Sequence, residues 1–220
     1  DDAFDTDEGY QGKGQFLFTM LGTTGNHGTE MNAHTSTSVD AQPRSHPSFY
    51  SMTVIGGGAA GRAGGLMNVR GGSGGKFGNV VLAHPNNIGL QLGGTGAKAC
   101  GGQTFYTTLP ASSVNIGTGA PGTTSSDGYL YWSPNNIIYG ASDPIKDDCS
   151  PPTSFTSLNV DPLLAAVDPL ETSRVPLDPR PTCGGPAFSN VDDFPDNFFQ
   201  VNGAYPSYKG AFGTDNWLRG

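Results

Sequence analysis

The sequence predicts an all-β fold: a right-handed parallel β-helix, or solenoid, with a loop-rich, aromatic C-terminal cap. Three observations support this prediction. The 220 residues include 34 Gly and 17 Pro, and both residue types oppose helix interiors. Residues 49–92 contain four short β-type runs, each ended by Gly, Pro or Asn, without a helical period. The chain then ends on an atypical, aromatic-rich segment, as solenoids do where they close an exposed end.

The first half of the chain supplies the predicted coils. An acidic, Gly-rich start leads into a strand at 14–21, GQFLFTML. Residues 22–48 are polar and small, which predicts a long loop, and loops of that length are usually functional or disordered. The four runs that follow are FYSMTVIGGG (49–58), GGLMNVRGG (64–72), KFGNVVLAH (76–84) and NIGLQLGG (87–94).

The second half is less regular. Residues 95–142 are interpreted as insertions with short strands at 103–109, 113–117, 129–133 and 136–140. Residues 160–171 have room for one helical turn, because Pro162 and Pro169 forbid a longer helix. We expect one domain, with coils over 1–142 and a Pro-rich wrap and cap over 143–220. The aromatic segment from 194 is expected to cover an open end of the core.

The net charge of −8 conceals a separation of charge along the chain. Residues 1–40 have seven acids and one base, and residues 127–220 have twelve acids and five bases. Between them lie no acids and five bases, Arg44, Arg62, Arg70, Lys76 and Lys98. A basic middle between acidic ends suits an anionic polysaccharide or an acidic face of another copy. Five dispersed bases argue against nucleic acid.

Three cysteines, Cys100, Cys149 and Cys183, allow at most one internal disulfide. Cys149 and Cys183 both lie in Pro-rich loops, so we favour that pair over a pair with Cys100. Scarce Lys and abundant Thr, Ser, Gly and Asn fit an extracellular or cell-surface protein. No signal peptide and no apolar run long enough to span a membrane are present, and the DDAFDTDEGY start suggests part of a longer chain.

Seven segments of the chain form a recognisable pattern: DDAFDTDEGYQGKGQFLF (1–18), HGTEMNAH (27–34), SHPSFYSMTVIGGG (45–58), GGLMNVRGGSGGKFGNVVL (64–82), DPLL (161–164), PLDPRPTCGGPAF (176–188) and YKGAFGTDNWLRG (208–220), the last two containing an LDPRP…GAF…DNWL signature. In these segments the chain resembles a family of secreted bacterial parallel β-helix proteins of the surface or lipoprotein type. The resemblance implies the fold, a surface location and further coils before residue 1, but no agreed catalytic residues, and residues 95–158 depart from it.

Two groups of residues suggest a metal ion. Asp5, Asp7 and Glu8 offer hard oxygen ligands for Ca²⁺, although Phe16 stands where an EF-hand would need its final Glu. These three residues are therefore the candidate ligands for Ca²⁺, but the favoured interpretation is a solvated acidic turn whose Asp side chains bond to nearby backbone amides. The second group, His27, Glu30 and His34, fits no known zinc spacing, so a surface loop with scattered histidines is the favoured interpretation.

No catalytic or cofactor-binding residues are predicted. The G-x-G-x-x-G at 56–61 follows a strand, but a dinucleotide site also needs a helix and an acid about 20 residues later, and the next acid is Asp127. β-Helices host pectate-lyase-like enzymes, for which Arg62 or Arg70 would be candidate bases, but residues 41–126 lack the acids such chemistry needs. We therefore expect a non-catalytic structural or adhesive module that associates with copies of itself or with other surface proteins. The alternative is a protein that binds or cleaves polysaccharides.

Overall fold

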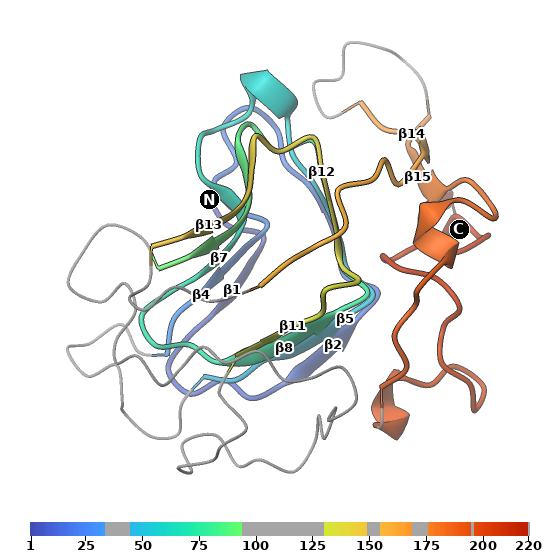
Figure 1. The fold of residues 1–220 in the computed structure, drawn as a ribbon, viewed down its shortest axis with the longest axis horizontal. Helices are drawn as coiled ribbons and strands as arrows, with labels where there is room; N and C mark the ends of the chain where they lie inside the picture. The colour runs from blue at the N-terminus through green and yellow to red at the C-terminus, as the bar shows by residue number, and fades with distance from the viewer. Residues whose placement is uncertain (34–44, 94–129, 149–154, 169–175, 195, 220) are drawn as a thin grey trace.

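The computed structural model describes residues 1–33, 45–93, 130–148, 155–168, 176–194 and 196–219. Its strands occur in sets of three, and each set forms one coil of a right-handed parallel β-helix (Figure 1). The predicted fold class is therefore confirmed. The four coils are β1 (Phe4–Thr6), β2 (Lys13–Gln15), β3 (Phe18–Met20); β4 (Thr29–Met31), β5 (Ser48–Tyr50), β6 (Thr53–Ile55); β7 (Gly65–Val69), β8 (Gly75–Gly78), β9 (Val81–Ala83); and β10 (Ile88–Leu92), β11 (Leu130–Trp132), β12 (Ile137–Tyr139).

Successive coils stack into three parallel sheets. Sheet A has the order β1-β4-β7-β10-β13, where β13 is Asp143–Asp147. Sheet B joins β2, β5, β8 and β11, and sheet C joins β3, β6, β9 and β12. In Figure 1 the three sheets enclose the core as the sides of a triangle, with sheet A on the left.

Apolar side chains fill the space between the sheets in rows along the helix axis. Sheet B contributes an aromatic row in which Phe49, Phe77 and Trp132 occupy equivalent positions in successive coils. The ring centroids of Phe49 and Phe77 lie 6.3 Å apart, and those of Phe77 and Trp132 lie 6.5 Å apart. Each such buried side chain stabilises the fold by roughly 1.5–3 kcal/mol.

The predicted loop over 22–48 contains a strand, β4, which is a correction to the sequence analysis. Thr29 and Met31 are buried in the core while Glu30 faces outward, so this three-residue strand has the β alternation. The coils also extend past the predicted boundary at residue 142, because β13 pairs with β10 in sheet A. Of the strands predicted within 95–142, those at 129–133 and 136–140 are confirmed as β11 and β12, and those at 103–109 and 113–117 lie outside the described residues.

Residues 160–171 do not form the expected helical turn where the structure describes them. Instead β14 (Leu164–Ala166) pairs antiparallel with β15 (Asp178–Pro181). Cys183 follows β15 as a free, exposed thiol, against the favoured pairing with Cys149, which lies outside the described residues. No helical segment in the described part of the chain is long and apolar enough to cross a membrane.

The C-terminal tail, residues 176–219, lies along the side of the coils and not over an end of the core as expected (Figure 1). Its short 3₁₀ turns η3 (Pro186–Phe188), η4 (Asn197–Phe199) and η5 (Trp217–Arg219) connect extended segments. Phe194 and Phe199 pack on the outward rings of Tyr50 and Tyr131, which belong to sheet B. The reason is chemical: these outer positions of sheets B and C carry apolar side chains, and the tail removes them from water.

Candidate functional site

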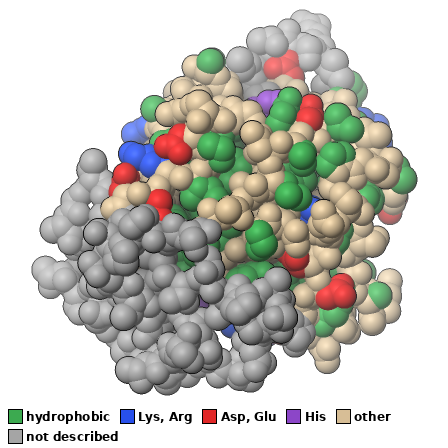
Figure 2. Space-filling view, in the orientation of Figure 1, with side chains coloured by type: hydrophobic (Ala, Val, Ile, Leu, Met, Phe, Trp, Pro, Cys, Tyr) green, Lys and Arg blue, Asp and Glu red, His purple; other side chains and the backbone are tan. Residues whose placement is uncertain are grey.

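A row of polar side chains runs along the outer face of sheet A. The strand register places equivalent residues of the five strands side by side, in the order Asp5, Glu30, Asn68, Gln91 and Lys146. We call this row the polar ladder. Successive side chains of a strand point to opposite faces of the sheet. The residues before and after each ladder position therefore face the core side, and the ladder residues face outward. Figure 2 shows acidic and basic side chains together along the left edge of the molecule, where Figure 1 has sheet A.

His27 lies beside the ladder at the corner that leads into β4. Its imidazole is buried, with 7% of the residue exposed, and its Nδ1 lies 2.6 Å from the carbonyl oxygen of Gly65. Because a carbonyl can only accept, Nδ1 is the donor in this contact, and Nε2 is the ring nitrogen left for a metal ion. Gly64 makes room for the ring: a Cβ at that position would lie 3.1 Å from Cε1 of His27.

Two carboxylates lie beside His27, those of Glu30 and Asp2. The Glu30 Oε2 atom lies 3.7 Å from Nε2. Asp2 accepts a hydrogen bond of 2.9 Å from the backbone N–H of His27, which holds its carboxylate at the corner. One ligand atom from each of Asp2, His27 and Glu30 can be chosen so that all lie within 4.8 Å of one another.

Two buried polar atoms beside this cluster have no hydrogen-bond partner among the residues that the structure describes. Asn68, only 4% exposed, places Nδ2 3.5 Å from Nε2 of His27, and its Oδ1 is buried without a hydrogen bond. Arg70 forms an ion pair with Glu30 through one terminal nitrogen, while its Nε is buried without a partner. Buried polar atoms are usually hydrogen-bonded, so these two atoms indicate a site with unused binding capacity.

The acidic start of the chain adds negative potential to the same face. Burial raises the pKa of Asp5, and the nearby carboxylates of Asp7 and Asp2 raise it further, against a lowering effect of Arg70. Asp5 and Asp7 are therefore electrostatic neighbours of the His27 cluster. A Ca²⁺ ion on Asp5, Asp7 and Glu8 stays a prediction, since these three do not form a ligand group of the kind found at Asp2, His27 and Glu30.

The donor set at Asp2, His27 and Glu30 does not suit Ca²⁺, the ion considered for Asp5, Asp7 and Glu8. One imidazole nitrogen and two carboxylates are ligands of Zn²⁺ or Mn²⁺, whereas Ca²⁺ prefers oxygen ligands alone. The hydrogen bond from Nδ1 to a backbone carbonyl is the usual outer-shell support of a metal-binding His. His34, which the sequence analysis grouped with His27 and Glu30, lies outside the described residues.

The glycine-rich segment at 56–61 is a coil corner. It contains a single 3₁₀ turn, η1 (Gly58–Ala60), in place of the helix that a dinucleotide site requires. Sequence reasoning missed Asp2 and Asn68 as members of the site. Asn68 lies between the core residues Met67 and Val69, so the β alternation alone predicts that its side chain faces outward. The sequence does not show that Asn68 lies beside Glu30, because that depends on the register between coils.

Comparison with known proteins defines the family. No curated protein and no solved structure matches the chain at a significant level. The family model described as a pectate-lyase like β-helix domain matches residues 1–123, which cover the first three coils and β10. On that match and on the coil architecture, the chain belongs to the pectate-lyase like β-helix domain family.

Proposed function

We propose that the chain binds an anionic polysaccharide along the outer face of sheet A, and that Asp2, His27 and Glu30 hold a divalent cation there. The observation that supports this most is the polar ladder with the His27 cluster beside it. Neighbouring strands are about 4.7–4.9 Å apart, so five ladder positions span roughly 19 Å. That length suits several consecutive sugar units lying along the helix axis.

The chemistry of the face favours an anionic chain. A divalent cation, the Arg70 guanidinium and the Lys146 ammonium supply positive charge for carboxylates of a uronate polymer. Lys146 is the ladder residue of β13 and is partly exposed, although it also pairs with Asp148 at 3.3 Å. The amide of Gln91 lies between these charges; its Oε1 accepts a hydrogen bond from the Gly65 N–H, and its Nε2 offers a donor for sugar hydroxyls.

Binding is favoured over cleavage. Cleavage by β-elimination needs a base that reaches a substrate proton. Arg70 is engaged by Glu30, and the Nε2 atom of the buried His27 also faces Glu30. The proposal is therefore a non-catalytic polysaccharide-binding module at the cell surface or outside the cell, where such polymers occur.

The proposal is tested with metal-stripped protein. We expect calorimetric titration with ZnCl₂ or MnCl₂ to show one site, with CaCl₂ binding more weakly, and oligogalacturonates to bind in the presence of the metal. Glu30→Gln should weaken metal binding at least tenfold, since it removes a charged ligand. Asp193→Asn, the same change in the tail, is the matched control and should leave binding unchanged.

Three results would contradict the proposal. They are the absence of metal binding, oligogalacturonate binding that is insensitive to both chelation and Glu30→Gln, and binding that Asp193→Asn impairs equally. Release of unsaturated sugar products that disappears in Arg70→Lys would replace binding by a lyase reaction at the same face.

A further inference from the structure

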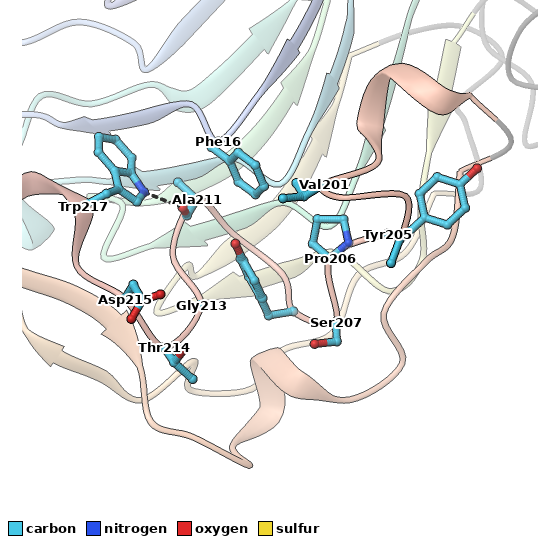
Figure 3. Close-up of a pocket in the computed structure, with 12 residues that line it drawn as sticks. Phe16, Val201, Tyr205, Pro206, Ser207, Ala211, Gly213, Thr214, Asp215 and Trp217 are labelled. Atoms are coloured by element: carbon cyan, nitrogen blue, oxygen red, sulfur yellow. Dashed lines mark hydrogen bonds between the residues drawn. The ribbon is translucent and has the colours of Figure 1, made fainter.

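A pocket of about 440 Å³ lies between the first coil and the C-terminal tail, on the opposite side of the molecule from the polar ladder (Figures 1 and 3). Its volume is within the usual range for small-ligand sites. Four aromatic residues and one carboxylate contribute to its lining, which also contains small and polar residues: Phe16, Tyr205, Tyr208, Trp217 and Asp215, with Ser207 beside them. All but Phe16 come from the tail.

The aromatic rings are held in fixed positions. Phe16 adopts a left-handed backbone with φ of 57°, which is unusual for a bulky residue and is often associated with functional sites. Its ring stacks on Tyr208 with centroids 6.2 Å apart and planes inclined by 26°. Tyr208 in turn lies over Gly213, where a Cβ would be 2.5 Å from Cε1 of the tyrosine.

Trp217 is the most exposed ring of the pocket. It stacks on Phe212 at 4.7 Å with nearly parallel planes, and its Nε1 donates to the Ala211 carbonyl at 2.9 Å. Half of the residue is nevertheless exposed to solvent. A large ring that is oriented by two contacts and still open to water is a preorganised surface for a ligand.

The polar groups of the pocket determine which ligand charge it accepts. The phenol of Tyr208 is protonated at neutral pH, as a tyrosine ordinarily is, and can donate a hydrogen bond; burial, and to a lesser extent the Asp215 carboxylate, raise its pKa further. The exposed carboxylate of Asp215 accepts hydrogen bonds and repels anions. Ser207 and Thr214 add hydroxyl groups at the edge.

We propose that this pocket binds a neutral sugar, one or two pyranose units of a glycan. A pyranose presents a flat face of C–H groups, which packs on aromatic rings whose faces carry partial negative charge. Its hydroxyls reach Asp215 and the Tyr208 phenol, and its lack of charge avoids repulsion by the carboxylate. The inference does not rest on the function proposed for sheet A, because the two sites share no residue.

The test uses the full chain and neutral tetrasaccharides of glucose, xylose, mannose and galactose, followed by tryptophan fluorescence and by calorimetry. At least one of them should bind and change the fluorescence of Trp217. Asp215→Asn and Tyr208→Phe, which keep the shape of the pocket, should each weaken binding about threefold to tenfold. Trp217→Ala should weaken it more than tenfold, whereas Phe198→Ala, an exposed aromatic of the tail outside the pocket, should have no effect.

Several outcomes would overturn the inference. One is the absence of binding to the whole panel at millimolar concentration. Others are binding that Asp215→Asn, Tyr208→Phe and Trp217→Ala all leave unchanged, and binding of choline or oligogalacturonate at this pocket in place of the neutral sugars. Glu30→Gln separates the two sites: it should reduce metal binding at sheet A and leave neutral-sugar binding intact.

Discussion

At the scale of single residues, His27 shows what the sequence could and could not predict. The types of His27 and Glu30 suggest ligands, but their spacing favours a surface loop with scattered histidines; the structure corrects this, because His27 is buried beside Glu30. Their meeting depends on the Gly65 carbonyl, which fixes the ring, and on Asp2, which holds the backbone. Gly65 is 38 residues away along the chain. Sequence spacing cannot reveal such contacts, because the loops between coils differ in length and hide the register.

The buried tyrosines predict how stability depends on alkaline pH. Burial first, and the Asp192 charge second, raise the pKa of Tyr131 to about 12, and burial also raises that of Tyr50. An unfolded tyrosine ionises near pH 10, so between about pH 10 and 12 the folded state binds more protons than the unfolded one. Stability should be unaffected by this group below pH 10 and should fall as the pH rises toward 12.

Tyr131→Phe tests this dependence. The variant should lose roughly 2 kcal/mol less stability than the parent between pH 10 and 12, since one buried phenol no longer has to ionise. Urea denaturation at a series of pH values measures the difference. An identical pH dependence in the two proteins would contradict the assignment.

At the scale of elements, short strands account for most of the differences between prediction and structure. The four runs over 49–92 were predicted because apolar residues and glycines alternate within them. The sequence does not predict strand β4, because its three residues, Thr-Glu-Met, lie in a polar stretch. Pairing with β1 and β7 decides that Thr29 and Met31 face the core. Strand β14 likewise depends on its partner β15, so its strand character comes from tertiary pairing.

The contact between β8 and the tail depends on a glycine. A Cβ on Gly78 would lie 2.5 Å from Cζ of Phe194 and 2.7 Å from Cε1 of Tyr50. We expect Gly78→Ala to displace Phe194 and to destabilise the protein by about 1–3 kcal/mol through overpacking.

Gly22→Ala is the matched control, because a Cβ there meets no atom within 4 Å. Urea denaturation measures stability, and hydrogen exchange over residues 194–199 reports whether the tail is released. Equal stability of the two variants would show that the β8 contact does not restrict the side chain at residue 78.

At the scale of the whole molecule, the aromatic content of the tail correctly predicts a segment that covers apolar surface, but the position predicted for it, over an open end of the core, is wrong. The composition of a segment shows that it can cover apolar surface. It does not show which apolar surface of the coils would otherwise be exposed to water. The structure answers this with outward apolar residues on sheets B and C, such as Tyr50, Val81 and Ile137. Asp192 then joins the tail to two coils: its backbone exchanges hydrogen bonds with Asn79, and its carboxylate accepts from Asn135 at 2.6 Å.

Asp192→Ala should therefore loosen the tail along its length. The lost carboxylate leaves the Asn135 amide and the Ser133 hydroxyl without their partner, and we expect a loss of about 1–3 kcal/mol. Hydrogen exchange over residues 186–199 should rise at the same time. Asp193→Ala, one position later, is the control and should change the stability by less than about 0.5 kcal/mol.

The path of the tail also has a consequence for cooperativity. In a solenoid each coil contacts only its neighbours, so end coils can unfold independently of the middle. Here the tail contacts Lys13 in the first coil through Asp196 and Asn135 in the fourth through Asp192. Because one segment links coils that do not touch each other, we expect their opening to be coupled, so that the stack unfolds in a single transition and not coil by coil.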